Sequence, residues 1–455
     1  MITYQDLLDV GENEADIAQF VATAIKSHKS GELYRQSKIA DEYLRQQNRT
    51  IVQYQKLLYT MAGQAVPDNF SANHKLASNY FYRLVTQQVQ YLLGNGIHWE
   101  NEASAEKLGK DFDIRLQDLA RIAIRDGVGF GFFNLDHLEV FSSLEFVPLY
   151  DEENGALMAG IRFWQIDPQK PLRATLYQID GVTEYIYRDS KPSVLKEKRP
   201  YKLNIGVSEA DGIEIYSGEN YPAFPIVPMW GNPLHQSELI GLREKIDAYD
   251  LIKSGFANDL DDASQIYWTI QNAGGMDDVD LVKFLEHMKT VKAAVVDQDG
   301  ASAEAHTIDV PYESREALLE RSEKDIYRDF MGVNTEQIAA GQVTATQIEA
   351  AYDPLNAKTD QFEYCVVDFL QEILQLAGVD DHPTFTRSLI KNVSEELEKL
   401  MLVAQVLPEE YLTKKVLLTL GDADKIDEVL DAKDRENVER MTGFTQRVVE
   451  DEEEA

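Results

Sequence analysis

Five aspartates are the most obvious candidates for chemistry in this chain of 455 residues. Carboxylate oxygens of this kind bind the metal ions that assist hydrolysis, so a metal-dependent hydrolase is one hypothesis. Its candidate ligands are Asp259, Asp261, Asp262, Asp277 and Asp278. The eight histidines are scattered without the short spacing of metal ligands, so we predict structural or surface roles for them and no metal site. They are His28, His74, His98, His137, His235, His287, His306 and His382.

Three further patterns could bind a ligand, and none has the required spacing. GVGFG at 127–131 opens into FFNLD and not into a helix, so it is not a dinucleotide loop. No G-x-x-x-x-G-K-[ST] nucleotide loop occurs in the chain. Asp297, Asp299 and Glu304 could suggest calcium, but Gly300 comes too early for an EF-hand loop. We predict a hairpin turn there, between strands at 291–296 and 305–310, and we expect no cofactor and no enzymatic activity.

Charge excludes one class of function and permits another. The chain has 79 acidic and 44 basic residues, a net charge of −35, whereas proteins that grip nucleic acid present a basic face. A surface that repels phosphate would instead suit a conduit through which a nucleic acid slides without sticking. No apolar run of 18 or more residues predicts a membrane span, and we expect a protein of the cytosol or one assembled there. The lone Cys365 lies among apolar residues at helical spacing and is predicted to act as a small buried hydrophobe.

The first half of the chain reads as helices followed by strands. Residues 1–62 have helical periodicity, and a second helix ends in YLLGNGIHWE at 91–100. Either Gly94 or Gly96 can take the left-handed conformation that ends this helix before an extended segment. From 127 to 228 alternating apolar residues and turn residues predict a β-rich region. The four prolines that follow, in YPAFPIVPMWGNP, exclude a central strand and indicate a junction.

A long helix at 237–265 follows this junction, with one apolar seam near a 3.5-residue repeat. Its length is about 43 Å at 1.5 Å per residue. Its polar faces carry an acidic set: Asp247, Asp250, Asp259, Asp261 and Asp262. A small α/β insert at 266–312 and a returning helix at 313–330 come next.

No lysine or arginine occurs between Arg328 and Lys358. Thr344 and Gln347 form a capping box that predicts a helix start at Ala345, and Gly378 is a predicted stop. Pro354 lies inside this helix and is expected to kink it. A loop without cations that leads into a kinked helix would suit the lining of a pore.

Four separated segments resemble one family in their order and spacing, the portal proteins of long-tailed phages of Gram-positive bacteria. They are YLLGNGIHWE at 91–100, IVPMWGNPL at 226–234, KIDAYDLIKSGFANDLDD at 245–262 and EKDIYRDFMGV at 323–333. The resemblance covers residues 70–430 and implies a mainly helical α+β portal fold with wing, stem, clip and crown regions. The C-terminal part is short for this family, so we expect a reduced crown.

The resemblance assigns a role to each part of the chain. The parts are the wing at 1–236, the first stem helix at 237–265, the clip at 266–312, the second stem helix at 313–330, the tunnel loop at 331–343, the kinked tunnel helix at 344–378, a wing return strand at 379–393 and an acidic helical crown at 394–455. In the loop and at the helix start it places residues that would face DNA: Asn334, Thr335, Glu336, Gln337, Gln342 and Thr344.

The implied function is a ring of identical subunits, usually twelve, at one vertex of the virion capsid. Double-stranded DNA would pass through it as a non-specific passenger. The implied partners are terminase, a head-completion adaptor, and the major capsid and scaffolding proteins, with assembly in the host cytoplasm. The competing hypotheses are a capsid-associated scaffolding or interaction protein without a channel, and the hydrolase considered above. A ring with a central hole would separate the portal from both.

Overall fold

The computed structural model describes most of the chain. The described residues are 2–59, 63–68, 71–188, 191–207, 214–263, 267–271, 302–306, 312–336, 345–388, 393–404 and 406–420, with a few between 425 and 435. The chain divides into two compact units, the first formed by 1–334 with 354–387 and the second by 335–353 with 388–455. The predicted mainly helical α+β class is confirmed.

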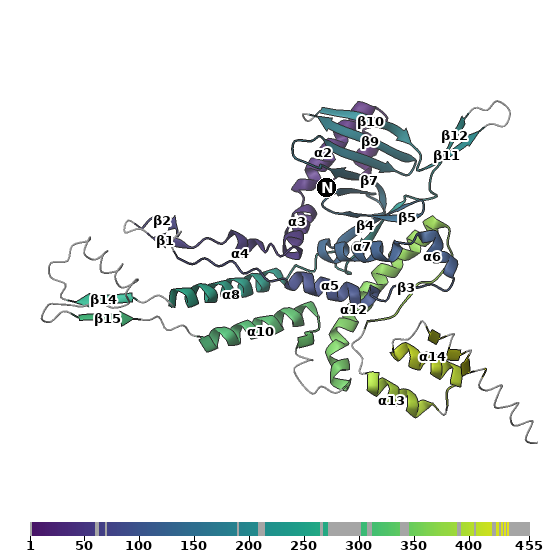
Figure 1. The fold of residues 1–455 in the computed structure, drawn as a ribbon. Helices are drawn as coiled ribbons and strands as arrows, with labels where there is room; N and C mark the ends of the chain where they lie inside the picture. The colour runs from purple at the N-terminus through teal and green to yellow at the C-terminus, as the bar shows by residue number, and fades with distance from the viewer. Residues whose placement is uncertain are drawn as a thin grey trace, which may run out of the picture. The chain divides into compact units, whose positions relative to one another are not determined.

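A five-stranded antiparallel sheet with one helix across its face forms one end of the first unit (Figure 1). The strand order is β10-β9-β8-β7-β6, with bounds Lys191–Arg199, Gly181–Arg188, Leu172–Gln178, Leu157–Trp164 and Phe146–Tyr150. Helix α2 (Glu14–Ser30) follows the short α1 (Tyr4–Asp9) and buries Val21 and Ile25 against alternate residues of the sheet such as Ile161. This alternation of buried and exposed residues is what a half-covered sheet requires.

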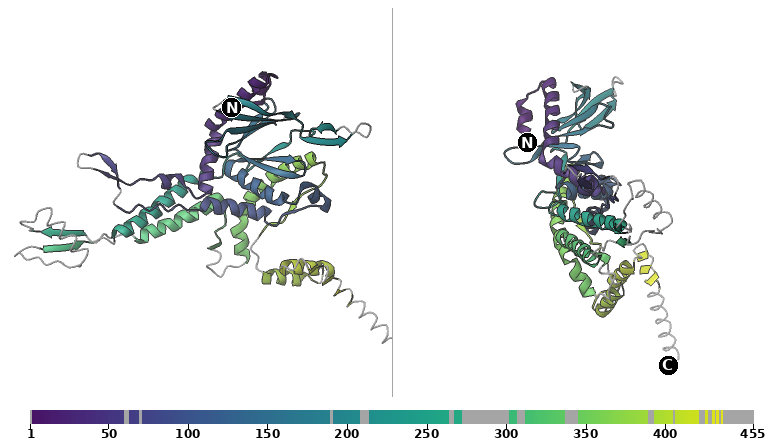
Figure 2. Two further views of the ribbon diagram at one scale, coloured as in Figure 1. Left: turned by 45° about the horizontal axis from the view of Figure 1, so that its top comes forward. Right: turned by 90° about the vertical axis from the view of Figure 1, so that its left-hand side faces the viewer.

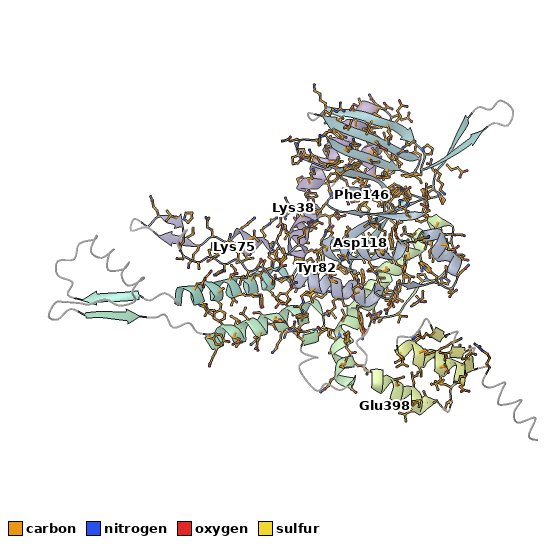
Figure 3. All side chains as sticks on the ribbon, in the orientation of Figure 1. Lys38, Lys75, Tyr82, Asp118, Phe146 and Glu398 are labelled. Carbon is orange, nitrogen blue, oxygen red and sulfur yellow. The ribbon has the colours of Figure 1, made fainter. Side chains whose placement is uncertain are left out.

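A three-stranded sheet of order β13-β4-β5 lies next to the first sheet, with bounds Ile226–Trp230, Val128–Asn134 and His137–Ser142. The proline-rich junction supplies β13, which is an edge strand, where a proline is tolerated. Phe130, Phe141 and Phe146 stack between the two sheets, and Phe146 is labelled in Figure 3. The glycines of GVGFG allow close packing, because a Cβ on Gly131 would lie 2.6 Å from Cζ of Phe369. A hairpin of β11 (Lys202–Val207) and β12 (Glu214–Glu219) extends from this region.

A helical layer holds the largest core cluster. Its members are α3 (Glu32–Leu44), α5 (Tyr80–Leu93), α6 (Glu102–Leu108), α7 (Phe112–Asp126) and the part of α12 (Ala345–Ala377) that lies in the first unit. At the end of α5, Gly94 keeps a right-handed helical conformation and Gly96 takes φ +76°, which decides between the two predicted caps. Strand β3 (Ile97–His98) then pairs with β16 (Thr384–Phe385).

Helix α12 begins at Ala345 and ends before Gly378, as predicted from its start and stop residues. Gly378 has φ +64°, and its N–H and that of Val379 bond to the carbonyls of Gln375 and Leu374. This is the pattern of a Schellman cap. Pro354 lies inside the helix, and the kink there stays a prediction.

Helices α8 (Arg243–Ala263) and α10 (Tyr312–Phe330) run side by side and antiparallel, away from the sheets (Figures 1 and 2). Strand β14 (Tyr267–Gln271) follows α8, and β15 (Ser302–His306) precedes α10 and pairs with β14. The expected outward and returning helices are therefore seen in this order, and of the insert between them the structure describes β14 and β15. The first helix starts six residues later than predicted, because 237–242 form turns.

Two predictions about local structure were wrong. The N-terminal helical region does not reach residue 62: α3 stops at Leu44, and after α4 (Arg49–Gln53) come β1 (Leu57–Tyr59) and β2 (Ala65–Pro67). Gln46 has φ +59°, which breaks the helix. Strand β15 pairs with β14, whereas 291–296, the predicted partner of the strand near 305, lie outside the described residues together with Asp297 and Asp299, so that pairing stays a prediction. Glu304 lies in β15 opposite Thr269 and not in a turn, because Ala303 and Ala305 alternate with polar residues as strand residues do.

In the second unit, α13 (Val393–Val403) and α14 (Glu409–Leu420) pack together. The predicted helical C-terminal region is thus seen up to Leu420.

Candidate functional site

The paired helices α8 and α10 are joined at both ends by ion pairs. Lys245 pairs with Asp329 near the core, and Asp259 pairs with Arg315 at the far end. Phe256 and Tyr312 pack at the far end, with ring centroids 5.8 Å apart. These contacts fix the register of the antiparallel pair.

Two of the five aspartates predicted to lie on an acidic face of the stem are internal acceptors, so that prediction is corrected for them. Asp247 accepts hydrogen bonds from the hydroxyls of Tyr43 and Thr50. Asp250 is fully buried and accepts bonds from the Ser78 N–H at 2.9 Å and from the Asn48 amide. Burial raises the pKa of Asp250, while the bonds from Asn48 and Ser78 oppose the rise. Both carboxylates are turned inward because neighbouring backbone and side-chain donors need acceptors.

Asp259 and Asp261 do not form a metal site with described neighbours. Asp259 is paired with Arg315, and Asp261 lies 2.5 Å from Nε2 of His74. The side chain of Asp262, like all of Asp277 and Asp278, lies outside the described residues. Among the residues that the structure describes, no group of three His, Cys, Asp or Glu side chains could hold a metal ion. Burial also raises the pKa of the Cys365 thiol, which disfavours the reactive thiolate.

A segment that forms neither helix nor strand, residues 71–79, lies along α8; we call it the strap (Figure 1). The His74 N–H donates to the Asn258 side chain at 2.7 Å, and the Leu76 N–H donates to the Ser254 hydroxyl at 3.0 Å. The Ser78 N–H donates to the Asp250 carboxylate at 2.9 Å. These acceptors are four residues apart on one helical face and are at most 6% exposed. The polar stripe of α8 therefore supplies hydrogen-bond acceptors for the backbone N–H groups of the strap, a role that no sequence pattern indicated.

Helix α10 ends in a hydrogen-bonded cap, and the predicted tunnel loop begins at this cap. Met331 has φ +64°, and the N–H groups of Met331 and Gly332 bond to the carbonyls of Arg328 and Tyr327, which is a Schellman cap. A Cβ on Gly332 would lie 2.7 Å from Cδ2 of Leu84, so a larger residue here would have to displace the Leu84 side chain.

The amide of Gln87, on α5, then holds the chain beyond this cap. It accepts from the Val333 N–H at 2.9 Å and donates to the Val333 carbonyl at 2.8 Å. The first residues of the loop are thus anchored to the core.

Lys358, the first cation after the stretch that lacks basic residues, is used inside the protein. Its Nζ donates to Glu238 at 2.7 Å and to the carbonyl of Phe330, the last residue of α10, at 2.9 Å. Burial lowers the pKa of Lys358, and the Glu238 carboxylate opposes this. A cation at a helix C-terminus is stabilised by the carbonyls there. Lys358 therefore joins α12, α10 and the segment that leads into α8.

The structure places only part of the predicted loop. Asn334 donates to Glu323 of α10 at 3.2 Å, which makes it part of the helix cap region. Thr335 and Glu336 belong to the second unit, while Gln337, Gln342 and Thr344 lie outside the described residues. The idea that these six residues line a channel stays a prediction.

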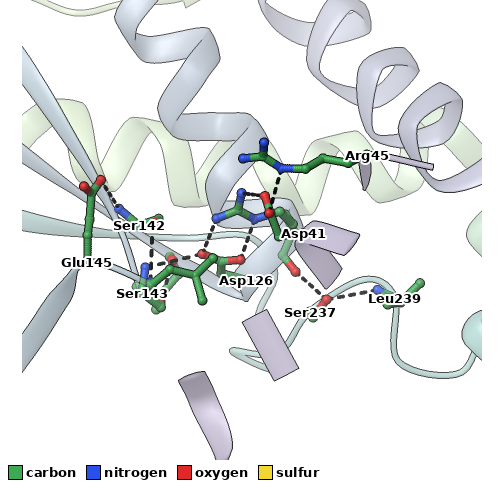
Figure 4. Close-up of polar contacts among 11 residues, drawn as sticks. Asp41, Arg45, Asp126, Ser142, Ser143, Glu145, Ser237 and Leu239 are labelled. Carbon is green, nitrogen blue, oxygen red and sulfur yellow. Dashed lines mark hydrogen bonds and ion pairs between the residues drawn. The ribbon is translucent and has the colours of Figure 1, made fainter. Parts of the chain in front are cut away.

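A buried ionic network lies next to the start of α8, and no sequence pattern indicated it (Figure 4). Arg125, at the end of α7, pairs with Asp126 at 2.6 Å and with Asp41 of α3 at 2.7 Å. The Ser237 hydroxyl donates to the Arg125 carbonyl just before α8 begins. Burial raises the pKa of Asp126, and the bond from Arg125 opposes the rise. The network ties two helices and a turn to the segment that leads into α8.

Comparison with known proteins decides the family. The family model described as phage portal protein, SPP1 Gp6-like, matches residues 24–439. The chain belongs to this phage portal protein family. The resemblance seen in the sequence is thereby confirmed.

Two curated portal proteins are similar along most of their length. The portal protein of Clostridium phage phiCD119 is 24% identical over 378 residues, which are 76% of this chain and 81% of the relative. The portal protein of Bacillus phage SPP1 is 24% identical over 384 residues, 75% of this chain and 72% of the relative.

Solved structures of gene transfer agent necks are also similar. The neck of an empty particle aligns with a TM-score of 0.46 at 10% identity, covering 75% of this portal protein and 90% of that chain. A neck computed with C12 symmetry aligns with a TM-score of 0.45 at the same identity and coverage. The role of this portal protein is that of a connector in the phage particle. None of its described helices is long and apolar enough to cross a membrane.

Proposed function

We propose that the portal protein forms a closed ring of about twelve identical subunits, a number compatible with cyclic symmetry. The ring occupies one vertex of the capsid, is assembled in the host cytoplasm, and remains in the virion. Its axial channel admits double-stranded DNA during packaging and releases it during ejection. The stem is the pair α8 and α10, the wing is built on the two sheets, and the clip begins with β14 and β15.

The observation that carries this proposal is the absence of lysine and arginine from 329 to 357, directly after the stem. Double-stranded DNA carries a charge every ~1.7 Å of its axis, so each cation in the channel would bind it and slow its movement. The basic residues that flank this stretch also support the proposal, because carboxylates pair with both of them. Arg328 is paired with Asp325 and Asp329, and Lys358 is held by Glu238.

The remaining partners follow from the proposed position in the capsid. The clip would dock terminase during packaging and the head-completion adaptor afterwards. The wing would face the major capsid and scaffolding proteins. The chemistry that moves DNA would come from terminase, because this chain lacks a Walker loop.

The test is a packaging assay with Gln337→Lys and Gln342→Lys combined. Each subunit then adds two cations to the channel, so packaging should slow or stall, more strongly at low salt where charges are less screened. Rings should still form, as seen by electron microscopy. The matched control is Gln53→Lys with Gln55→Lys, which adds the same charge at exposed positions of the first unit. Packaging by the loop variant at the control's rate in low salt would show that the loop does not meet DNA.

A further inference from the structure

A hollow of about 890 Å³ lies between α2 and the turn that joins β7 to β8. We call it the cationic pocket, because Lys26, Lys170 and Arg188 line it and no carboxylate does. The side-chain amide of Gln19 adds a hydrogen-bonding group. Three cations without an acid are unusual for a chain with a net charge of −35.

The cations of the pocket have no partners within the described part of the chain. None of Lys26, Lys170 and Arg188 forms an ion pair with another described residue. Arg188 also lies directly opposite Lys191 in the ladder of β9 and β10. Like charges at paired positions of a sheet repel each other and destabilise it. An anion bound in the pocket would relieve this repulsion.

The wall that carries Lys170 is held in place by its own hydrogen bonds. The side-chain amide of Gln165 donates to the carbonyls of Pro168 and Lys170 at 3.2 and 2.8 Å. The Lys170 N–H donates to the Asp167 carbonyl at 2.8 Å. On the opposite side, the Tyr187 hydroxyl donates to the Ala18 carbonyl of α2 at 3.0 Å. A site whose walls are already fixed loses less conformational entropy when a ligand binds.

We propose that the cationic pocket binds an acidic polypeptide segment of a partner protein, through two or more neighbouring carboxylates. The floor favours a peptide over nucleic acid, because Pro168, Pro171 and Leu172 contribute apolar surface suited to side-chain methylenes. A DNA duplex is a convex rod that is much wider than an extended peptide, so a hollow between a helix and a turn fits the peptide better. The high negative charge of the whole chain also repels a long polyanion more than a short one. This binding does not depend on the proposed DNA channel.

The experiment measures binding of fluorescein-labelled octaglutamate to the full chain by fluorescence anisotropy at low salt. The expected result is saturable binding that weakens about tenfold when Lys26→Gln, Lys170→Gln and Arg188→Gln are combined. The matched control combines Lys38→Gln, Lys107→Gln and Arg173→Gln, which removes the same charge at exposed positions outside the pocket; Lys38 is labelled in Figure 3. The control should bind like the unchanged protein.

Because all six positions are exposed, both triple variants should fold, and equal melting temperatures would establish this. The single variant Lys170→Glu, in the turn, gives a second measurement and should also weaken binding. No binding of octaglutamate by the unchanged protein, or equal loss in the two triple variants, would overturn the proposal. Tighter binding of a short DNA duplex or of inorganic phosphate with the same dependence on the three cations would also overturn it.

Discussion

The strap on α8 gives the sharpest prediction from the structure. Replacing Ser254 by Ala removes the acceptor of the Leu76 N–H while leaving the methylene that packs there. An N–H left without its partner in this partly buried site costs about 1 to 2 kcal/mol, which corresponds to about 5- to 30-fold faster amide exchange of this residue. Replacing Asp250, Ser254 and Asn258 together by Ala should raise exchange across residues 74–78 to the rate of an unstructured segment.

Hydrogen exchange followed by mass spectrometry measures this on the peptide that covers 71–79. The matched control is Lys253→Ala, because Lys253 is exposed and adjacent to Ser254 but bonds to no strap residue. Exchange of this peptide should be unchanged in the control. Equal exchange in the triple variant and the unchanged protein would refute the idea that these side chains hold the strap.

Two other predictions concern buried charges. Lys358→Ala leaves the Glu238 carboxylate and the end of α10 without their cation, so the free energy of unfolding in urea should fall by about 3 to 5 kcal/mol. The control is Lys324→Ala, because Lys324 is exposed. A loss under about 1 kcal/mol for Lys358→Ala would contradict the role assigned to Lys358. For His28, burial lowers the pKa below its usual 6.5, with the bond to the Ser143 carbonyl opposing and Lys29 reinforcing the shift. The unfolded chain then binds the proton more readily, so the stability contributed by neutral His28 is full above pH 6.5 and is lost as pH falls through that value. Melting temperatures of the unchanged protein should therefore drop more between pH 8 and pH 5 than those of His28→Gln, and identical drops would show that His28 is not responsible.

Apolar periodicity was sufficient to predict a helix or strand where one of its faces packs on the core. The end of α5 at Leu93, the two ends of α12 and the strand that contains GVGFG all follow from apolar spacing and from capping residues. These signals depend only on residues close together in the sequence, so they can be recognised without knowledge of the rest of the fold. The order of helix, insert and helix in the stem was predicted for the same reason.

Sequence reasoning failed where a polar residue is buried by a distant part of the chain. Asp250 lies in a polar stripe of α8, and such a stripe on a helix predicts a solvent-exposed face. Nothing near it in sequence reveals that Ser78, 172 residues away, covers it. The pairing of β14 with β15 was missed because strand partners depend on which segments the fold brings together. The Arg125 network was missed for the same reason, since Asp41 is 84 residues from Arg125.

The hydrogen bonds between the strap and α8 also limit how long such an arrangement can be. Two residues of an extended chain span about 6.6 Å, whereas four residues of an α-helix rise about 6.0 Å. The spacing of the strap N–H groups therefore exceeds the spacing of the helix acceptors by about 0.6 Å per bond along the helix axis, and by about 1.2 Å from the first bond to the third. Each further bond in the same register would add to this difference, so an extended chain must bend or slip to follow the helix for long. Adding or removing one residue from the strap would break the common register of the three bonds.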